Sequence, residues 1–380
     1  MTFRTRKLTI WGLLSALLAV AIVAIGPASA QQLPIQKIPK PRPAQQRVKG
    51  VPMPKEVHAK WRPLPTDLEA LTPFDMSPFP FDGVKPNEGN FLNIFADGRR
   101  GHATGRGGTY WEDTTYNDRR VLLYMPKGFD IRKPAVMVVF FHGNGARLDR
   151  DVIARQRVPE QVLASGINAV LVAPQFAVDA LDSSAGSFWQ PGTFRQFLDE
   201  TTVHLVELYG DERTRKPFAA MPVVMMAYSG GYNPAAFSLA IGGADARIKG
   251  VMLLDALYGE VPKFTDWIVK RRDGFFVSSY TASSAGGNAE LKRALAPHNI
   301  HLETKLGAKF PKGSVTLLPA LPDAVHGDFV THAFVDDPIK ELLLRLPEYA
   351  HRPGAVKTKY VPPAVQVEIV PVADPNAPPP

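Results

Sequence analysis

The sequence predicts an α/β fold, in which a mainly parallel β-sheet carries helices on both of its faces. Short, continuously apolar segments alternate with longer amphipathic segments through the middle of the chain. This alternation is typical of parallel strands that are connected by helices. Because the apolar segments are continuous, we expect strands that are buried on both faces of the sheet.

The expected elements follow one another in a regular order. Segments 108–115 and 119–129 are expected to form an antiparallel pair of strands joined by a turn. Further strands are expected at 135–143, 168–175, 221–229, 248–259, 273–281 and 313–321. Helices are expected at 157–166, 191–210, 230–241, 288–299 and 337–349. Because sheets of this kind bind ligands beyond the carboxyl ends of their strands, the residues that follow each strand are candidates for a functional site.

The first 30 residues have the composition of a targeting segment. They combine a basic start, a 19-residue apolar run from Leu8 to Gly26, and an Ala-Ser-Ala end. This pattern predicts a signal peptide, 1–30, that is cleaved after Ala30, and therefore a periplasmic or secreted protein. The alternative is an uncleaved anchor, because the apolar run is long enough to span a membrane. We expect cleavage, and hence no stable membrane insertion of the mature chain.

Proline-rich segments flank the middle of the chain. Residues 31–65 are expected to form an extended linker and residues 352–380 a flexible tail. The chain of 380 residues is 45% hydrophobic and 21% charged, which are values typical of a globular protein. We therefore expect residues 66–351 to form one α/β domain.

Charge and residue content exclude several classes of function. Of the net charge of +8, the basic residues of the predicted signal peptide (Arg4, Arg6 and Lys7) supply +3, which leaves +5 for the mature chain. The other basic residues are scattered, which argues against a nucleic-acid partner. The absence of cysteine excludes a cysteine nucleophile, a thiolate zinc site and an iron–sulfur cluster. No metal-ligand spacing or dinucleotide fingerprint is present, so no metal or cofactor is expected, and the basic glycine-rich segment 98–108 is interpreted as a loop.

Four expected strands end in residues that could act together in catalysis. In chain order these are a glycine-rich loop at 142–146, Ser229, Asp255 and His326. A serine hydroxyl is a poor nucleophile unless a base lies within hydrogen-bond reach and a third group orients that base. We therefore expect Ser229 to be the nucleophile, His326 the base, and Asp255 the acid that orients the base.

The segment around Ser229 has the properties of a sharp turn from strand to helix. Such an elbow tolerates only small neighbours because the strand and helix backbones pass close together, and Ala227 and Gly231 meet this requirement. The helix that begins at Gly230 directs its first backbone amides toward the serine oxygen. We expect the Gly230 amide and the Asn144 amide to form an oxyanion hole.

These motifs resemble those of the α/β-hydrolases, and most of all the secreted bacterial esterases and lipases of that fold. The resemblance runs from Gly108 to Tyr349 and includes the His-Gly loop at 142–143, the elbow at 227–231 and the order Ser, Asp, His. It implies a three-layer α/β-hydrolase fold and a serine hydrolase. The chain departs from the usual pattern in two ways: alanine replaces the first glycine of the elbow, and the acid follows one strand earlier than is usual.

Other residues compete for two of these roles. His332 follows His326 closely and is the main alternative for the base. Asp245, Asp323 and Asp328 are alternatives for Asp255. Asp323, however, is too near His326 in the sequence to orient its ring easily, and Asp328 can cap the helix that follows.

Aromatic residues near the strand ends are candidates for substrate binding. Tyr228 is expected to form a wall of the acyl pocket because it precedes the nucleophile. The other candidates for the cleft are Phe188, Trp189, Tyr258 and Trp267. The sequence is equally consistent with a position of these aromatic residues in the hydrophobic core.

The combined prediction is an exported serine hydrolase that cleaves a carboxylic ester of a small-molecule or acylated substrate through an acyl-enzyme. Two alternatives stay open: an amidase or peptidase that acts on cell-envelope peptides with the same residues, and a non-catalytic binding member of the fold. A haloalkane or epoxide enzyme would need an aspartate at the elbow, and Ser229 argues against it. The sequence leaves the oligomeric state open.

Overall fold

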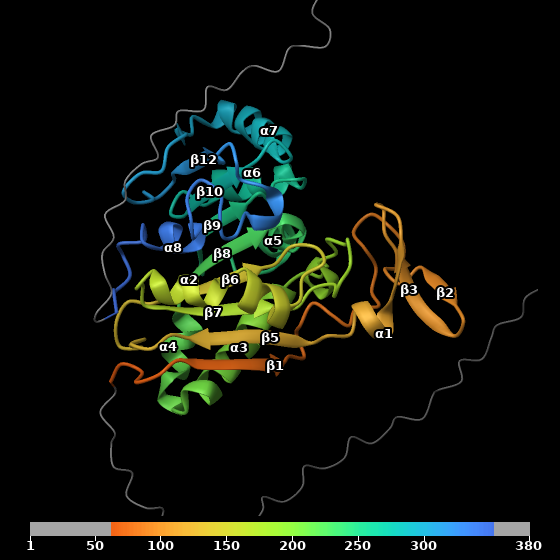
Figure 1. Cartoon of the computed structure of the whole chain (residues 1–380), viewed down its shortest axis with the longest axis horizontal. Helices are drawn as coiled ribbons and strands as arrows, with labels where there is room; N and C mark the ends of the chain where they lie inside the picture. The colour runs from red at the N-terminus through yellow and green to blue at the C-terminus, as the bar shows by residue number, and fades with distance from the viewer. Residues whose placement is uncertain (1–61, 353–380) are drawn as a thin grey trace, which may run out of the picture. The chain divides into compact units, whose positions relative to one another are not determined.

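Residues 62–352 are described by a computed structural model (Figure 1). The predicted signal peptide, nearly all of the linker and nearly all of the tail lie outside the described residues. Within the described part the largest element is a nine-stranded sheet of order β1-β5-β7-β6-β8-β9-β10-β12-β11. Its strands are β1 (Leu68–Pro73), β5 (Arg120–Met125), β6 (Val136–Phe141), β7 (Ala169–Pro174), β8 (Val223–Tyr228), β9 (Ile248–Leu254), β10 (Phe275–Tyr280), β11 (Leu302–Glu303) and β12 (Val315–Pro319).

The sheet is mainly parallel, as the sequence predicts. Strand β5 pairs antiparallel with β1 and with β7, and every other pair in this sheet is parallel. Figure 1 shows the strands side by side with helices before and behind them. This strand order with helices on both faces is the three-layer α/β-hydrolase fold.

Two separate hydrophobic cores cover the two faces of the sheet. Along β6, alternate side chains enter opposite cores, because successive side chains of a strand point to opposite faces. One core also contains α3 (Thr193–Tyr209), α4 (Arg215–Ala220), α5 (Tyr232–Ile241), α6 (Val261–Lys270) and α7 (Ala285–Leu295). The other contains α2 (Val158–Ala164), α8 (Pro338–Leu343) and a π-helical segment, Leu148–Arg155. Each fully buried large apolar side chain stabilises the fold by about 1.5–3 kcal/mol.

The register of the parallel strands brings the carboxyl ends of β6, β8, β9 and β10 to nearly the same level of the sheet. Phe141 at the end of β6 pairs with Ala227 on β8. Tyr228 at the end of β8 pairs with Leu254, which ends β9 and is itself adjacent to Ser279 on β10. The loops that follow these strands therefore leave the sheet at nearly the same level.

The expected hairpin between 108–115 and 119–129 is wrong. Strand β4 (Thr109–Trp111) instead pairs with β3 (Arg99–Ala103), which pairs with β2 (Ile94–Ala96), and the segment interpreted as a loop thus contains a strand. A helical turn, α1 (Glu112–Thr115), separates β4 from β5. Five of the six residues of β5 are buried, so this strand requires neighbours on both sides, which β1 and β7 supply. Figure 1 shows the small sheet beyond the carboxyl ends of the parallel strands.

The described helices are all short or amphipathic. None of the helices in 62–352 is both long enough and apolar enough to cross a membrane.

Two adjacent glycines at the start of α7, Gly286 and Gly287, differ in how closely they approach the loop after β9. A Cβ atom added to Gly287 would lie 1.9 Å from the carbonyl oxygen of Leu257, whereas one added to Gly286 would meet nothing within 4 Å. We expect Gly287→Ala to lower the free energy of unfolding by about 1–3 kcal/mol, because the helix must move away from the loop. Gly286→Ala should raise it by about 0.5 kcal/mol, because alanine restricts the unfolded chain. Urea unfolding of both variants measures the difference, and equal effects would contradict this packing.

Candidate active site

Ser229 occupies a sharp turn between β8 and α5. Its φ angle of +52° lies in the left-handed region, which non-glycine residues seldom adopt, so the backbone is strained at this position. Gly231 allows the turn because a Cβ at this residue would lie 2.4 Å from the carbonyl oxygen of Phe141 on the neighbouring strand β6. The strain and the tight packing together project the serine side chain from the edge of the sheet.

His326 lies against the serine. Its Nε2 atom is 2.8 Å from Ser229 Oγ, and its side chain is 40% exposed. The ring stacks on Tyr228 with 5.2 Å between the ring centroids, and the Tyr228 hydroxyl donates a 2.6 Å hydrogen bond to the His326 carbonyl oxygen. Tyr228 therefore supports both the ring and the backbone of His326.

Asp255 lies behind the histidine with no exposed surface. It follows β9, and its Oδ2 atom is 2.7 Å from His326 Nδ1. Its carboxylate also accepts hydrogen bonds from the Thr281 backbone N–H at 3.0 Å, the Thr281 hydroxyl at 2.9 Å, the Ser283 hydroxyl at 3.1 Å and the Ser284 hydroxyl. Burial raises the pKa of Asp255, but the hydrogen bonds from His326, Ser284 and Thr281 outweigh burial and hold the pKa well below its usual range.

The charge on Asp255 determines the tautomer of His326. An ionised carboxylate only accepts hydrogen bonds, so the Nδ1 atom of His326 carries a proton and donates it to Asp255. The Nε2 atom of a neutral ring is then an acceptor, and the Ser229 hydroxyl donates to it. The three side chains form a continuous chain of hydrogen bonds from the buried Asp255 charge to the Ser229 hydroxyl.

The glycine-rich loop after β6 packs directly against Ser229. A Cβ atom added to Gly143 would lie 2.7 Å from Ser229 Cβ, so only glycine permits this approach. The backbone N–H of Asn144 makes no hydrogen bond with any residue that the structure describes. Gly230 lies in the first turn of the helical segment, where backbone N–H groups lack intrahelical acceptors. Two backbone donors are thus available beside the serine.

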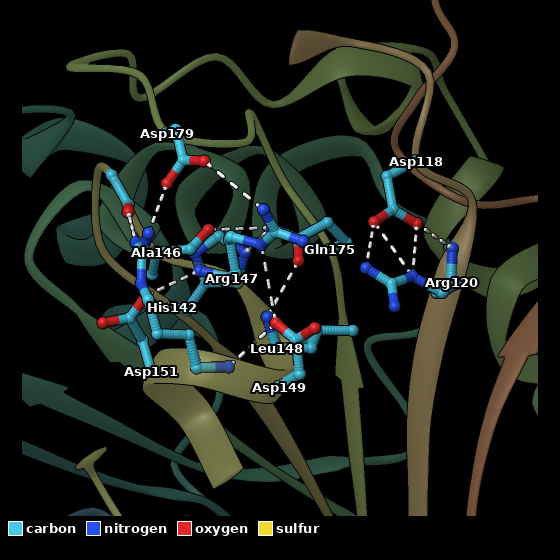
Figure 2. A network of polar contacts seen from close by, with 12 residues as sticks. Asp118, Arg120, His142, Ala146, Arg147, Leu148, Asp149, Asp151, Gln175 and Asp179 are labelled. Carbon is cyan, nitrogen blue, oxygen red and sulfur yellow. Dashed lines mark hydrogen bonds and ion pairs between the residues drawn. The ribbon is translucent and has the colours of Figure 1, made fainter. Parts of the chain in front are cut away.

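His142 and Gln175 hold this loop in place, and Figure 2 shows them at the centre of a polar network. His142 Nδ1 donates to the Gly143 carbonyl oxygen at 2.8 Å, and its Nε2 accepts from the Phe176 backbone N–H at 2.9 Å. The Gln175 side-chain amide donates to the Ala146 carbonyl oxygen at 2.9 Å and to His142 Nε2 at 3.0 Å. Its oxygen accepts at 2.9 Å from the backbone N–H of Leu148, which begins the π-helical segment after the loop. Burial lowers the pKa of His142 to about 4, so the ring is neutral at physiological pH.

The aromatic residues predicted to bind substrate occupy different environments. Trp189 lines a pocket of about 190 Å³, and its Nε1 donates to Asn233 at 3.2 Å. The Tyr258 hydroxyl is 3.3 Å from both His326 Nδ1 and Asp255 Oδ2. Phe188 is fully buried among other phenylalanines and has no surface for a ligand. Trp267 is buried against Gly274, which precedes β10, so it lies at the opposite edge of the sheet from Ser229.

The alternative residues do not reach the serine hydroxyl. His332 Nδ1 is 2.8 Å from Asp336, and its Nε2 is 3.3 Å from Asp323. These two carboxylates raise the pKa of His332, and the hydrogen bond that His332 donates to Asp336 is the largest cause. His332 and Asp323 thus pair with each other, and among the described residues neither Asp323 nor Asp328 makes an ion pair with His326.

Sequence analysis missed the groups that support the site. Thr281, Ser283 and Ser284 follow β10 and surround Asp255, and Gln175 follows β7. The same strand-end rule that singles out Ser229 could have found them, because all four directly follow or closely follow parallel strands. No group of three or more His, Asp or Glu side chains within 62–352 is arranged to hold a metal ion.

Comparisons with known proteins give likenesses of fold only. Neither protein-family models nor curated protein sequences give a match. Among solved structures, the chain is similar to a mutant feruloyl esterase module from Clostridium thermocellum complexed with sinapinate, with 14% identity, coverage of 77% of this chain and 100% of that chain, and a TM-score of 0.39. It is also similar to an IroE-like serine hydrolase from Shewanella oneidensis, with 12% identity, coverage of 60% and 74%, and a TM-score of 0.38.

A third similar structure is a thermostable esterase from Pseudomonas putida, with 12% identity, coverage of 68% and 81%, and a TM-score of 0.33. Because these TM-scores lie below 0.5, the fold assignment depends on the strand order of this chain. The fold and the side-chain arrangement together define the class: an α/β-hydrolase-fold protein with a Ser-His-Asp hydrogen-bond chain at the carboxyl edge of its sheet.

The low pKa of His142 predicts a specific loss of stability in acid. The unfolded chain binds the proton near the ordinary value of 6.5 and the folded protein only near 4, so acidification through this range favours the unfolded state. We expect His142 to contribute a slope of up to about 1.4 kcal/mol per pH unit to the free energy of unfolding. Urea unfolding of wild type and His142→Gln between these pH values measures the contribution. Identical slopes in the two proteins would contradict a buried, neutral His142.

Proposed function

We propose that this protein is a serine hydrolase that cleaves a carboxylic ester through an acyl-enzyme. The observation that carries the proposal is the chain of hydrogen bonds from Ser229 Oγ to His326 Nε2 at 2.8 Å and from His326 Nδ1 to Asp255 Oδ2 at 2.7 Å. A serine whose hydroxyl lies next to an oriented imidazole base is an activated nucleophile. The strained backbone at Ser229 supports the same role, because such strain is common at nucleophile elbows.

In the first step, Ser229 Oγ attacks the ester carbonyl carbon while His326 Nε2 accepts the hydroxyl proton. The imidazolium that forms is stabilised by Asp255, whose carboxylate stays ionised throughout. The carbonyl oxygen becomes negatively charged as the bond forms. The backbone N–H groups of Asn144 and Gly230 are the proposed donors to this oxyanion, and such donors act most strongly where they are fixed in advance.

In the second step, the tetrahedral intermediate collapses and the bond to the leaving alcohol breaks. His326 Nε2 gives its proton to the alcohol oxygen, and the acyl group stays on Ser229. The exposure of the His326 side chain leaves room for a leaving group to reach this nitrogen. A water molecule then attacks the acyl carbon while His326 Nε2 accepts its proton. The bond between the acyl carbon and Ser229 Oγ breaks, His326 returns the proton to Oγ, and the acid is released.

The pocket near the elbow supports a small or medium-sized substrate. It is lined mostly by polar and charged residues, among them Ser183 and Asn233. Ser183 adjoins the elbow, because its Oγ would lie 2.7 Å from a Cβ placed on Gly230. Trp189 adds an aromatic surface to this pocket. We propose that one part of the substrate, either acyl group or alcohol, enters it.

Export belongs to the same proposal. The basic start, the apolar run and the Ala-Ser-Ala end of residues 1–30 support a cleaved signal peptide and a periplasmic or secreted location. The proposed partner is therefore a substrate that the enzyme meets outside the cytoplasm, and no metal or cofactor takes part in the steps above.

An active-site probe tests the proposed nucleophile. Purified wild type should react covalently with a fluorophosphonate, which labels serine residues that an adjacent base activates. Ser229→Ala should lose all labelling, and turnover of an aryl ester should fall by at least about 10³-fold in Ser229→Ala and His326→Ala. Asp255→Asn should reduce turnover by about 10²- to 10⁴-fold, because the ring loses its tautomer.

His332→Ala is the matched control for this experiment, since His332 is a partly exposed histidine from the same segment that pairs with Asp323 and Asp336. Labelling and turnover should stay at wild-type levels in this variant. A folded wild type that resists the probe would refute the enzymatic proposal and would favour the non-catalytic alternative.

Matched ester and amide substrates distinguish the ester hydrolase from the amidase or peptidase. We expect hydrolysis of para-nitrophenyl butyrate and little hydrolysis of the corresponding para-nitroanilide, measured as kcat/KM for the two. The same triad cleaves both classes in different proteins, so the comparison depends on the pocket and not on the nucleophile. A higher kcat/KM for the anilide, or cleavage of peptides in preference to esters, would favour the alternative.

A further inference from the structure

We propose that Arg106 binds an anionic group of the substrate, a carboxylate or a phosphate, at the entrance to the Ser229 site. This inference rests on the proposed ester hydrolase and extends it by assigning a charge to the substrate. It gives a function to the basic, glycine-rich segment 98–108, which sequence analysis interprets as a loop.

Arg106 lies at the tip of a hairpin that projects toward the elbow. The hairpin consists of β3 and β4, and its turn is closed by hydrogen bonds from the Gly107 N–H to the Thr104 carbonyl oxygen at 3.0 Å and from the Thr104 N–H to the Gly108 carbonyl oxygen at 3.1 Å. The backbone N–H of Leu181 donates to the Tyr110 hydroxyl at 3.2 Å, which ties the base of the hairpin to the loop that precedes Ser183. Figure 1 shows the hairpin extending beside the loops at the carboxyl edge of the large sheet.

A hydrogen bond connects Arg106 to the proposed oxyanion loop. When the Asn144 amide is oriented by its partners, its nitrogen donates to the Asp182 carbonyl oxygen at 2.8 Å and to the Ser183 hydroxyl at 3.1 Å. Its oxygen then accepts a hydrogen bond from Arg106 Nη1 at 3.2 Å. Asn144 is also the residue whose backbone N–H is a proposed oxyanion donor. The guanidinium is thus separated from the reacting centre by a single side chain.

The positive charge of Arg106 also acts on two neighbouring tyrosines, Tyr232 and Tyr258, whose ring centroids are 6.2 Å apart. Burial raises the pKa of Tyr232 and of Tyr258, and the charge of Arg106 opposes this effect at both. The Tyr258 hydroxyl lies 3.3 Å from His326 Nδ1. Arg106 is therefore hydrogen-bonded to Asn144 and close enough to Tyr232 and Tyr258 for its charge to act on both hydroxyls.

The charge of Arg106 is not compensated by an acidic residue. Its neighbours in the small sheet are paired, Arg99 with Asp113 and Arg100 with Glu112. Among the residues that the structure describes, by contrast, no carboxylate lies within ion-pair distance of Arg106, whose side chain is exposed.

The nearby acids are already occupied. In the adjoining pocket Glu88 pairs with Lys85 at 2.7 Å and Glu260 pairs with Lys263. The Asp182 carboxylate accepts hydrogen bonds from the Tyr116 hydroxyl at 2.9 Å and from the Ser184 hydroxyl at 2.8 Å. The guanidinium keeps free N–H donors, and its planar fork matches a carboxylate or phosphate with two parallel hydrogen bonds.

The test compares charged and neutral esters of equal size. On the acyl side, the pair is the para-nitrophenyl monoester of glutaric acid and the same ester of glutaramic acid. On the alcohol side, the pair is para-acetoxybenzoate and para-acetoxybenzamide. Wild type should have a higher kcat/KM for the anionic member of at least one pair, and this preference should decrease as salt screens the exposed charge. The pair that shows the preference identifies the side of the ester that carries the anion.

Variants then assign the preference to Arg106. In Arg106→Gln, which keeps a donor for the Asn144 oxygen, the anionic-to-neutral ratio of kcat/KM should fall by about tenfold. Arg106→Lys should recover part of the ratio because it restores the charge. Arg99→Gln is the matched control: it removes a positive charge from the same small sheet but away from Asn144, and it should leave the ratio within about twofold of wild type.

Three results would overturn the inference. The first is an unchanged ratio in Arg106→Gln while wild type hydrolyses the neutral esters, which leaves the proposed ester hydrolase standing. The second is an equal loss with the charged and neutral members, which would show that Arg106 only positions Asn144. The third concerns wild type alone: either it shows no preference for the anionic ester in either pair, or its preference does not change with salt. This result decides against the inference even if Arg106→Gln does not fold. If wild type hydrolyses none of the four esters, the proposed function fails as well.

Discussion

A buried negative charge at Asp255 is the constraint on which the rest of the site depends. A carboxylate with no exposed surface is unstable unless hydrogen-bond donors replace its water. The loop after β10 supplies these donors through Thr281, Ser283 and Ser284, and His326 supplies another from the loop after β12. The hydrogen bonds to the Asp255 carboxylate therefore hold the loops after β10 and β12 together, and they orient the His326 imidazole toward Ser229.

A second set of buried polar contacts fixes the other side of the site. Gln175 and His142 hold the loop after β6 so closely to the elbow that Gly143 touches the serine. Burial keeps His142 neutral, and only a neutral ring can accept the Phe176 N–H while donating to the Gly143 carbonyl oxygen. The proposed oxyanion donors and the proposed triad are thus held by separate networks, which meet at the Ser229 elbow.

Prediction from sequence was accurate where apolar runs are long and failed where strands are short. The buried strands β6, β7 and β8 are nearly all apolar, so their position and their parallel pairing follow from the pattern. Strands β3 and β4 are short and partly exposed, and their partner choice depends on tertiary contacts, which explains the wrong hairpin. Phe188 and Trp267 resemble pocket residues in the sequence, but whether an aromatic side chain faces a cleft or a core depends on packing.

The sequence by itself determined the buried strands β6, β7, β8, β9, β10 and β12 and the residues that follow them, because the hydrophobic pattern of these strands and the small residues at the elbow act locally. From these it follows that Ser229, Asp255 and His326 lie at one edge of a parallel sheet. Only the tertiary structure decided which histidine meets the serine, which hydroxyls surround the acid, and that Arg106 reaches Asn144. These contacts join residues far apart in the chain, and their distances depend on the packing of the whole domain rather than on any local pattern.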